Sequence, residues 1–325
     1  MTDAPAPPPR PARPPATRPP ATRRPDAGRA ELRVAQLNAG SLFEPGWDER
    51  RTEIIAWLDE VRADVVCLEE IWSDAHHPPT ARWIAERTAI DYHLAFGGLA
   101  LAEGLWKEPT LRFGAAVLSR WPIELHEVWR LPVDPDDAPG DRFLHGFPNV
   151  LLHARTAGLD VFATHLTGAP HHGRHRCHQV LALDRLVRTV RGGRDGAVPF
   201  GQRQPHPPAL LCGDFNAEPD SDEIRFLCGL TSLGGTTTFW QDAWRVAGEG
   251  PGLTQDWRSH PLAARLNVHR KRIDYVFVGS PFLRMGDAGR VLRAEPAFHE
   301  PRTGVQASDH SGLVVDLAWP QRPPD

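Results

Sequence analysis

The sequence of 325 residues contains few lysines, tyrosines, methionines and cysteines, and it lacks long apolar runs. No apolar run approaches the ~18 residues of a membrane-spanning helix. The first residues, MTDAPAPPPR, contain no apolar segment typical of a signal peptide. We therefore expect a cytoplasmic protein that is neither secreted nor embedded in a membrane. The four cysteines, Cys67, Cys177, Cys212 and Cys228, show no paired spacing, which predicts buried thiols in a reducing compartment and not a disulfide framework.

Charge is distributed unevenly, and only two of the 37 basic residues are lysines, Lys107 and Lys271. Residues 1–30 contain 10 Pro, 7 Ala, 6 Arg and 2 Asp, which gives this tail a charge of +4. Since the formal total is −4, residues 31–325 have a charge of −8. The Pro-rich composition predicts a disordered, solvated tail. The acidic remainder is not typical of a protein that holds DNA mainly through phosphate contacts, although a bound metal and a local basic patch can override net charge.

Apolar runs typical of strands alternate with helical patterns between residues 32 and 319. The predicted strands are 32–38, 64–70, 114–119, 150–155, 159–166, 209–216, 273–278 and 311–319. The predicted helices are 47–63, 174–190 and a short one capped by Ser221, and Gly and Pro predict a surface loop at 191–208. Ala157-Gly158 predicts a hairpin turn. This mixture predicts an α/β fold, a four-layer sandwich in which two packed mixed β-sheets are flanked by helices.

Polar side chains recur at or beside the ends of these strands. They are Asn38, Glu70, His165, Asp214, Asn216, Asp309 and His310, and Asp274 lies at the start of a strand. Layered α/β folds bind ligands beyond their strand ends, and a buried charge needs partners. Taken singly, such residues have ordinary explanations: Asn38 can cap a turn, and His165 can be a satisfied core histidine. One shared site explains all of them together.

Such a set of oxygen and imidazole donors suits a hard cation. Carboxylate and amide oxygens favour Mg²⁺ or Mn²⁺, with water completing the coordination shell. The chemistry that follows is phosphoester hydrolysis. The metal polarises the phosphoryl group, a His or Asp aligns the attacking water, and imidazoles stabilise charge on the equatorial oxygens.

Seven segments resemble those of one known family: LRVAQLNAG, DVVCLEEIW, GAAVLSRWPI, ATHL, LLCGDFNAEPDS, RIDYVFVGS and ASDH, in this order. They are similar to the endonuclease/exonuclease/phosphatase superfamily, which includes deoxyribonuclease I, exonuclease III-type repair nucleases, neutral sphingomyelinases and inositol polyphosphate phosphatases. The resemblance spans roughly residues 32–319, and GDFNAEPDS is its most specific segment. It implies a domain at residues 31–320 that hydrolyses phosphoesters with Mg²⁺ or Mn²⁺.

At the metal, the resemblance implies Asn38, Glu70 and Asp309 as the residues beside the cation. In the family pattern a Gln commonly precedes the glutamate, whereas Glu69 occupies that place here. We expect Glu69 to lie behind the metal, where an additional negative charge would make the site more acidic.

At the phosphate, the resemblance implies five further roles. His165 would contact the scissile phosphate. Asp214 would align the attacking water or protonate the leaving group, with Asn216 orienting it. His310 would act on the phosphate or as general base, held by the carboxylate of Asp274, because a carboxylate fixes the tautomer and stabilises the imidazolium.

Some features depart from subfamily patterns. Relatives similar to the sphingomyelinase branch have Asn where FGAAVLSR has Ala115, which weakens any substrate contact implied there. We identify no counterpart of the Tyr and Arg that repair-type nucleases place near the target phosphate, because the only tyrosines are Tyr92 and Tyr275. Trp72 and Trp106 are expected in loops, where they could line a substrate cleft.

The run HHGRHRCH at residues 171–178 contains four histidines and a cysteine. His175 and His178 would share a helix face, as a zinc pair requires, but no second pair at zinc spacing occurs elsewhere. We favour a loop that enters a helix beside the active-site rim. There these histidines, with Arg174 or Arg176, would meet substrate phosphate at the helix N-terminus.

These observations predict a metal-dependent phosphoester hydrolase, foremost a nuclease-like phosphodiesterase in which water attacks phosphorus in line. The alternative is a phosphatase or phospholipase that acts on a small-molecule, inositol or lipid-headgroup phosphoester, which the acidic body favours. A non-catalytic binding module on the same fold is the rival outside the enzymes, and the complete polar set argues against it. The expected partner is a phosphoester substrate, with nucleic acid as one candidate. No integral membrane association or obligate protein partner is expected.

Overall fold

The computed structural model describes residues 31–134, 140–195, 206–258, 260–266, 270–279 and 287–319. The tail predicted at residues 1–30 lies outside these ranges, as do residues 196–205 of the predicted surface loop. Within these ranges, no helix is long and apolar enough to span a membrane.

Two six-stranded sheets form the centre of the molecule. The first contains, in spatial order, β13 (Val291–Ala297), β14 (Gly312–Ala318), β1 (Glu31–Asn38), β2 (Val65–Ser73), β4 (Arg112–Ser119) and β3 (His93–Ala100). The second contains β5 (Ile123–Arg130), β6 (Val150–Thr156), β7 (Leu159–His165), β8 (Leu210–Asp214), β12 (Asp274–Gly279) and β9 (Trp240–Asp242). In these sheets β1 pairs parallel with β2 and β7 pairs parallel with β8, while the other neighbours are antiparallel. Both sheets are therefore mixed, as predicted.

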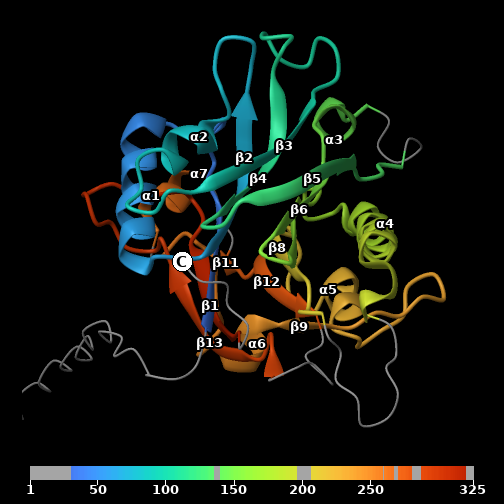
Figure 1. The fold of residues 1–325 in the computed structure, drawn as a ribbon. Helices are drawn as coiled ribbons and strands as arrows, with labels where there is room; N and C mark the ends of the chain where they lie inside the picture. Colours follow the sequence, from blue (N-terminus) through green and yellow to red (C-terminus); the bar gives the residue numbers. More distant parts are fainter. Residues whose placement is uncertain are drawn as a thin grey trace, which may run out of the picture.

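Helices cover the outer faces of the two sheets (Figure 1). The first sheet packs against α1 (Trp47–Val61) and α2 (Thr80–Ala85), and the second packs against α4 (Gly173–Arg191) and α5 (Asp222–Leu227). The shorter elements are α3 (Arg142–Gly146), η1 (Gly192–Asp195), α6 (Ala243–Ala247), α7 (Pro261–Leu266) and the two-stranded pair β10 (Gln255–Asp256) and β11 (Arg270–Lys271). The predicted four-layer sandwich is thus confirmed.

The alternation of side chains along the central strands explains these layers. In β2, Val65 and Cys67 face the core between the sheets, whereas Val66 and Leu68 face the helices. Successive strand residues point to opposite faces, so a strand that is apolar at every position must be covered on both sides. The uninterrupted apolar runs therefore specify strands in the middle of the two sheets.

In the two six-stranded sheets, the strands that these patterns missed all lie at the edges. They are β13 and β3 in the first sheet and β5 and β9 in the second, and the short pair β10 and β11 was missed as well. Most of β5 is exposed, and β13 contains Pro296, which cannot donate to a ladder. Edge strands need only one neighbour and often have charged or interrupted sequences, so they lack a continuous apolar signal.

Local predictions have mixed outcomes. Ala157 and Gly158 adopt φ values of 50° and 72°, which confirms the hairpin turn between β6 and β7. Trp72 lies within β2 and not in a loop, because the strand continues to Ser73. Ser221 occupies the N-cap position of α5, but its hydroxyl donates to the carbonyl of Glu218 instead of capping the helix.

All four cysteines are free thiols. Cys67 and Cys212 are buried in the core between the sheets, as predicted. Cys177 and Cys228 are only half-buried, contrary to the prediction, because they lie in α4 and at the end of α5, on the helical surface of the sandwich.

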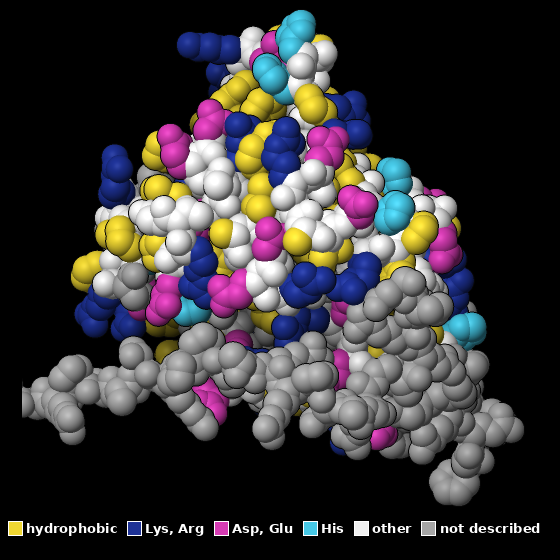
Figure 2. Space-filling view, turned by 60° about the vertical axis from the view of Figure 1, so that its left-hand side comes forward, with side chains coloured by type: hydrophobic (Ala, Val, Ile, Leu, Met, Phe, Trp, Pro, Cys, Tyr) yellow, Lys and Arg dark blue, Asp and Glu magenta, His cyan; other side chains and the backbone are white. Residues whose placement is uncertain are grey.

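The face of the molecule in Figure 2 has acidic, basic and apolar side chains intermixed. Among the side chains coloured there, none of the three classes forms an extended single-type surface. This face therefore offers no broad basic area of the kind that follows a nucleic-acid backbone.

Candidate active site

The polar ends of the strands meet at one end of the sandwich. In the first sheet, Asn38 on β1 lies opposite Glu69 on β2. In the second sheet, His165 on β7 and Asp274 on β12 both lie opposite Asp214 on β8. The two sheets face each other here, and hydrogen bonds between side chains join them.

Gln36, in β1, is one of these bridges and was not among the predicted site residues. Its buried Nε2 donates to Oε2 of Glu69 at 2.7 Å and to Oδ1 of Asp274 at 3.0 Å. A signal for it was present, because an amide within the apolar run LRVAQLN faces the same side of the strand as Asn38. Gln36 fixes Asp274 from behind.

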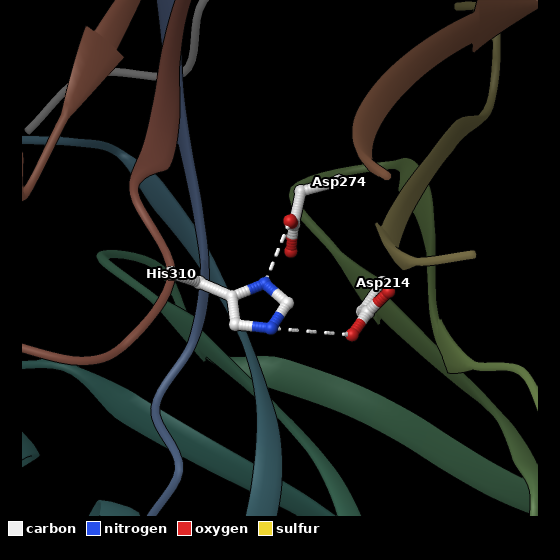
Figure 3. A group of neighbouring side chains, drawn as sticks. All are labelled: Asp214, Asp274 and His310. Atoms are coloured by element: carbon white, nitrogen blue, oxygen red, sulfur yellow. Dashed lines mark hydrogen bonds and ion pairs between the residues drawn. The ribbon is translucent and has the colours of Figure 1, made fainter. Parts of the chain in front are cut away.

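His310 lies between two aspartates, on the loop before β14 (Figure 3). Its Nδ1 is 2.8 Å from Oδ2 of Asp274, and its Nε2 is 3.9 Å from Oδ2 of Asp214. Burial opposes a charged imidazole, but the carboxylates of Asp274, Asp309 and Asp214 outweigh it and raise the pKa of His310 well above its ordinary value. The surroundings therefore favour an imidazolium whose Nε2 can donate a hydrogen bond.

Asp214 lies where the two sheets come together. Its Oδ2 accepts from Nδ2 of Asn38 at 3.0 Å and is 3.6 Å from Nε2 of His165. Its Oδ1 accepts the backbone N–H of Asn216 at 2.8 Å. Burial, followed by the negative charge of Asp274, raises the pKa of Asp214. A carboxylate in such a setting is suited to exchange a proton with a reacting group.

The backbone around Asp214 explains the residues of the GDFN segment. Gly213 has a φ of 151°, and a Cβ there would lie 1.9 Å from the carbonyl oxygen of Thr164 on β7. Asn216 has a φ of 50°, and its Nδ2 donates to the carbonyl of Leu166 at 3.0 Å. Gly213 thus allows β8 to approach β7, and Asn216 holds Asp214 through its backbone while its side chain secures the chain after β7.

A β-bulge places Glu70. The pairing of β2 with β4 shifts between Leu68 and Ile71, and Glu70 has a φ of 57°. As a result Glu69 faces the gap between the sheets, whereas Glu70 reaches the cavity, where its Oε1 accepts from Nδ2 of Asn38 at 3.2 Å. Burial raises the pKa of Glu70.

Glu69 is fully buried behind the site. Burial raises the pKa of this carboxyl group well above its usual range. Burial thus opposes the negative charge expected at Glu69 from the sequence.

A further carboxylate, Glu44, was not predicted. Its Oε2 accepts the backbone N–H of Asp309 at 3.1 Å and lies 3.3 Å from Nη1 of Arg50. Arg50 is buried and donates to the carbonyls of Ala39 at 2.7 Å and Ala307 at 3.0 Å, which clamps the loops after β1 and before β14 together. Burial, followed by the charge of Asp309, raises the pKa of Glu44 to about 10.

These residues surround a cavity of about 470 Å³. Its polar side contains six of the predicted residues, which are Glu70, His165, Asp214, Asn216, Asp309 and His310. Asn38 and Asp274 are buried directly behind them. The other side is apolar and includes Phe43, Phe113, Phe143 and Phe147. The structure therefore brings all eight predicted residues together.

The histidine-rich run enters α4 beside this cavity. His172 lines the cavity, with its Nε2 3.7 Å from Oδ2 of Asp141. Arg176 is buried and donates to Oε1 of Glu223 at 2.6 Å, and Arg174 is exposed on α4. Neither arginine is among the residues that line the cavity, so the structure does not support the expectation that one of them meets substrate phosphate.

The donor set on the polar side fits a hard divalent cation. Glu44, Glu70 and Asp309 gather there, and the raised pKa values of both glutamates show that burial and crowding disfavour their charged forms. A cation with oxygen preference would relieve that cost. Asn38 directs Nδ2 to the carboxylates, and its Oδ1 accepts the N–H of Gly40 at 3.1 Å. In this arrangement Asn38 positions Glu70, and its Oδ1, which accepts one hydrogen bond, keeps a second lone pair.

Asp214, Asp274 and His310 also have donor atoms within 4.8 Å of one another. Both oxygens of Asp274 already accept hydrogen bonds, one from Gln36 and one from His310, and the side chain is fully buried. This trio therefore suits a proton-transfer unit better than a cation site.

Comparison with known proteins agrees with this geometry. The model of the Endonuclease/Exonuclease/phosphatase family matches residues 35–310, and among curated proteins none matches significantly. An endonuclease/exonuclease/phosphatase from Beutenbergia cavernae DSM 12333 is similar with a TM-score of 0.62 and 25% identity, over 89% of this chain and 72% of that one. Truncated Caenorhabditis elegans TDP2 has a TM-score of 0.60 and 18% identity, over 89% and 98% of the two chains. D. rerio TDP2 complexed with a single strand DNA product has a TM-score of 0.61 and 16% identity, over 89% and 100%.

The two TDP2 structures show the fold alone, because their sequences are distant. The family model covers most of the chain, including every predicted site residue. The protein therefore belongs to the endonuclease/exonuclease/phosphatase family, whose members are generally hydrolases that act on phosphoester bonds.

Proposed function

We propose that the protein is a phosphodiesterase that uses a divalent cation and water. The observation that supports this most strongly is the convergence of two imidazoles on one carboxylate oxygen. Nε2 of His165 and Nε2 of His310 lie 3.6 and 3.9 Å from Oδ2 of Asp214, beside a cavity with further carboxylates. Groups that can bind phosphate oxygens thus lie next to a group that can exchange a proton.

Glu70 and Asp309, with Glu44 beside them, would hold Mg²⁺ or Mn²⁺, which would polarise the phosphoryl group and lower the pKa of a bound water. Arg50 supports this set by clamping the two loops that contain Glu44 and Asp309. Asn38 keeps Glu70 in place.

The remaining chemistry belongs to Asp214 and the side chains around it. Asp274 accepts from Nδ1 of His310, which leaves Nε2 to donate to a phosphate oxygen. His165 offers a second donor on the other side of Asp214. Asp214 aligns the attacking water or protonates the leaving oxygen, with Asn216 holding it through its backbone N–H.

A nuclease-like form of this activity is supported by the fold that the chain shares with D. rerio TDP2, which was solved with a single strand DNA product. A small-substrate form is supported by the cavity, because neither lysine nor arginine occurs among the described residues that line it. Plasmid and single-stranded DNA, assayed beside bis-p-nitrophenyl phosphate, distinguish the two forms.

The proposed function is tested with protein that has been treated with EDTA and then supplied with Mg²⁺ or Mn²⁺. We expect no hydrolysis of bis-p-nitrophenyl phosphate in EDTA and recovery with either metal. Glu70→Gln should require more metal and lose activity, whereas Glu86→Gln, the same change at an exposed position, should not. Full activity in metal-free protein, or in Glu70→Gln at limiting metal, would contradict the proposal.

A further inference from the structure

An aromatic surface forms the apolar side of the cavity. We call it the aromatic wall, and it consists of Phe43, Phe113, Phe143 and Phe147, with Trp106 packed against it. Phe43 belongs to the loop after β1, Phe113 to β4 and Phe143 to α3. Three separate parts of the chain therefore contribute to one surface.

Phe147 is the centre of the aromatic wall. Its ring centroid lies 5.3 Å from that of Phe43 and 5.3 Å from that of Phe113. It stacks on Phe143 with centroids 5.6 Å apart and an interplanar angle of 6°. Such contacts fix the rings relative to one another, so the surface is formed before any ligand arrives.

Core packing does not explain the whole wall. Phe113 is buried, but Phe143 is 61% exposed and Phe43 is 46% exposed. Aromatic side chains gathered at the side of a cavity and left open to water are typical of a binding surface. Phe43 and Phe143 are the rings that a ligand would cover.

The charges around the cavity restrict the ligand. Its described lining contains neither lysine nor arginine, and Asp141 and Glu44 lie on it together with the carboxylates of the polar side. A polynucleotide needs positive charge along its backbone as well as stacking surfaces. The imidazoles and the proposed cation can neutralise the negative charge of one phosphate. The surface beside them is apolar.

The aromatic wall begins next to the phosphate-binding groups. The ring centroid of Phe113 lies 6.5 Å from that of His165, and Phe43 directly precedes Glu44 in the chain. An ester group that packs on the wall would therefore lie within one bond's reach of a phosphate at His165.

We infer that the cavity takes phosphodiesters with one uncharged hydrocarbon ester group, which packs on Phe43 and Phe143 while the phosphate lies between the imidazoles and the acidic side. This inference depends on the proposed function for the position of the phosphate. It assigns Phe43 and Phe143 as specificity-determining residues.

The test is the binding of four methyl phosphodiesters in Mg²⁺, measured by isothermal titration calorimetry. The second ester group is methyl, hexyl, choline or thymidine, so that size, positive charge and a nucleoside are compared with a hydrocarbon chain. Each fully buried methylene changes an equilibrium constant by about fourfold. We expect the hexyl ester to bind at least about 10-fold more tightly than the dimethyl ester, and more tightly than the other two.

Variants identify the surface responsible. In Phe43→Ser/Phe143→Ser, the ratio of the hexyl to the dimethyl dissociation constant should move to within about threefold of one. Phe239→Ser removes a ring that is 56% exposed and lies outside the cavity lining, so it should leave the ratio unchanged. Since all three rings are exposed, the substitutions remove little core packing.

Equal binding of the hexyl and dimethyl esters would overturn the inference, as would tighter binding of the choline or thymidine ester, or a double variant that keeps the hexyl preference. The proposed function is judged separately, by hydrolysis of bis-p-nitrophenyl phosphate with the same protein. Hydrolysis without a hexyl preference sinks only the inference about the ester group. A hexyl preference without hydrolysis would support the aromatic wall as a binding surface and would contradict the proposed phosphodiesterase activity.

Discussion

Strand β7 has a cluster of buried charge at each end, and the two clusters differ in how that charge is neutralised. Near its start, Oδ1 of Asp160 lies 2.9 Å from Nε2 of His153 and accepts from Nε of Arg155 at 2.9 Å. Its Oδ2 accepts from Arg191 at 2.8 Å and from Arg194 at 2.9 Å. Burial acts to raise the pKa of Asp160, but these donors outweigh it and hold that pKa well below its ordinary value.

At the other end of β7, His165 faces carboxylates that the chain does not neutralise to the same degree. The pKa values of Glu44, Glu70 and Asp214 are raised, in each case mainly by burial. The two clusters therefore differ in where their partners come from. Asp160 has its partners within the fold, whereas the function proposed above supplies a cation and a phosphate to the carboxylates around His165.

The largest effect should come from removing the charge at the start of β7. Asp160→Asn leaves the buried guanidinium of Arg191 with fewer partners, so it should lower the free energy of unfolding by about 3 kcal/mol. Activity per folded molecule should be kept, because Asp160 lies at the far end of β7 from the cavity. Urea unfolding measures the free energy of unfolding, and initial rates of hydrolysis measure the activity per folded molecule. A decrease in the free energy of unfolding of less than about 1 kcal/mol would show that Asp160 contributes little to stability, and the two ends of β7 would then not differ as described.

A change at the other end of β7 should lower the activity and leave the stability nearly unchanged. His165→Gln removes a donor beside Asp214 and should cut kcat for bis-p-nitrophenyl phosphate by about 100-fold or more. Its thermal midpoint should stay close to that of the parent protein, because the side chain is partly exposed at the cavity. His126→Gln, at an exposed position of β5, is the matched control. Unchanged kcat in His165→Gln would show that this end of β7 is not part of the chemistry.

The layers of the fold and the site at the end of β7 could largely be predicted from the sequence. Strands that are apolar at every position and end in a polar residue, such as LRVAQLN and LLCGD, indicate both the buried layers and the end where a site forms. Because β1 and β2 are parallel neighbours, as are β7 and β8, their carboxyl ends had to lie at the same edge. From the sequence, Asn38, Glu70, His165 and Asp214 could be placed together because each lies at a strand end and in a segment that resembles the family. The parallel pairing explains why the members of each pair share an edge.

The rest depends on geometry that one sequence does not specify. Glu44 lies in a loop, and Arg50 follows the pattern of an exposed helical position, yet both are brought inward by the fold. The different directions of Glu69 and Glu70 come from a bulge and a positive φ that no residue type in DVVCLEE demands, so only the family resemblance indicated which glutamate reaches the cavity. Two of the arginines around Asp160 were missed because Arg191, the last residue of α4, and Arg194, in η1, were assigned to a surface loop.

Metal binding at the carboxylates near His165 should stabilise the folded protein. If Mg²⁺ binds the carboxylates near His165, a concentration of 100 times its dissociation constant should raise the free energy of unfolding by about 2.7 kcal/mol at most. Glu70→Gln should reduce this gain, and Asp160→Asn should keep it. Urea unfolding in EDTA and in Mg²⁺ gives the comparison. An equal gain in Glu70→Gln would place the ion elsewhere.

The smallest effect is the pH dependence of the contribution that Asp160 makes to the free energy of unfolding. Its pKa in the folded protein is below the ordinary value of about 3.9. Its contribution is therefore complete above that value and is lost as the pH falls through the folded pKa. The difference in unfolding free energy between the parent protein and Asp160→Asn should be constant from about pH 7 to 5, and below about pH 4 it should narrow by up to about 1.4 kcal/mol per pH unit. Urea unfolding at several pH values tests this, and a difference that stays constant to about pH 3 would contradict it.

The most direct test of the central claim is one variant, Asp214→Asn, measured for both hydrolysis and unfolding in the same preparation. Because burial and neighbouring charge disfavour the Asp214 carboxylate, its neutral replacement should be at least as stable as the parent protein and should lose about 100-fold or more of kcat. A variant that unfolds more easily yet hydrolyses bis-p-nitrophenyl phosphate at the parental rate would show that Asp214 is a structural charge like Asp160, and the account would fail.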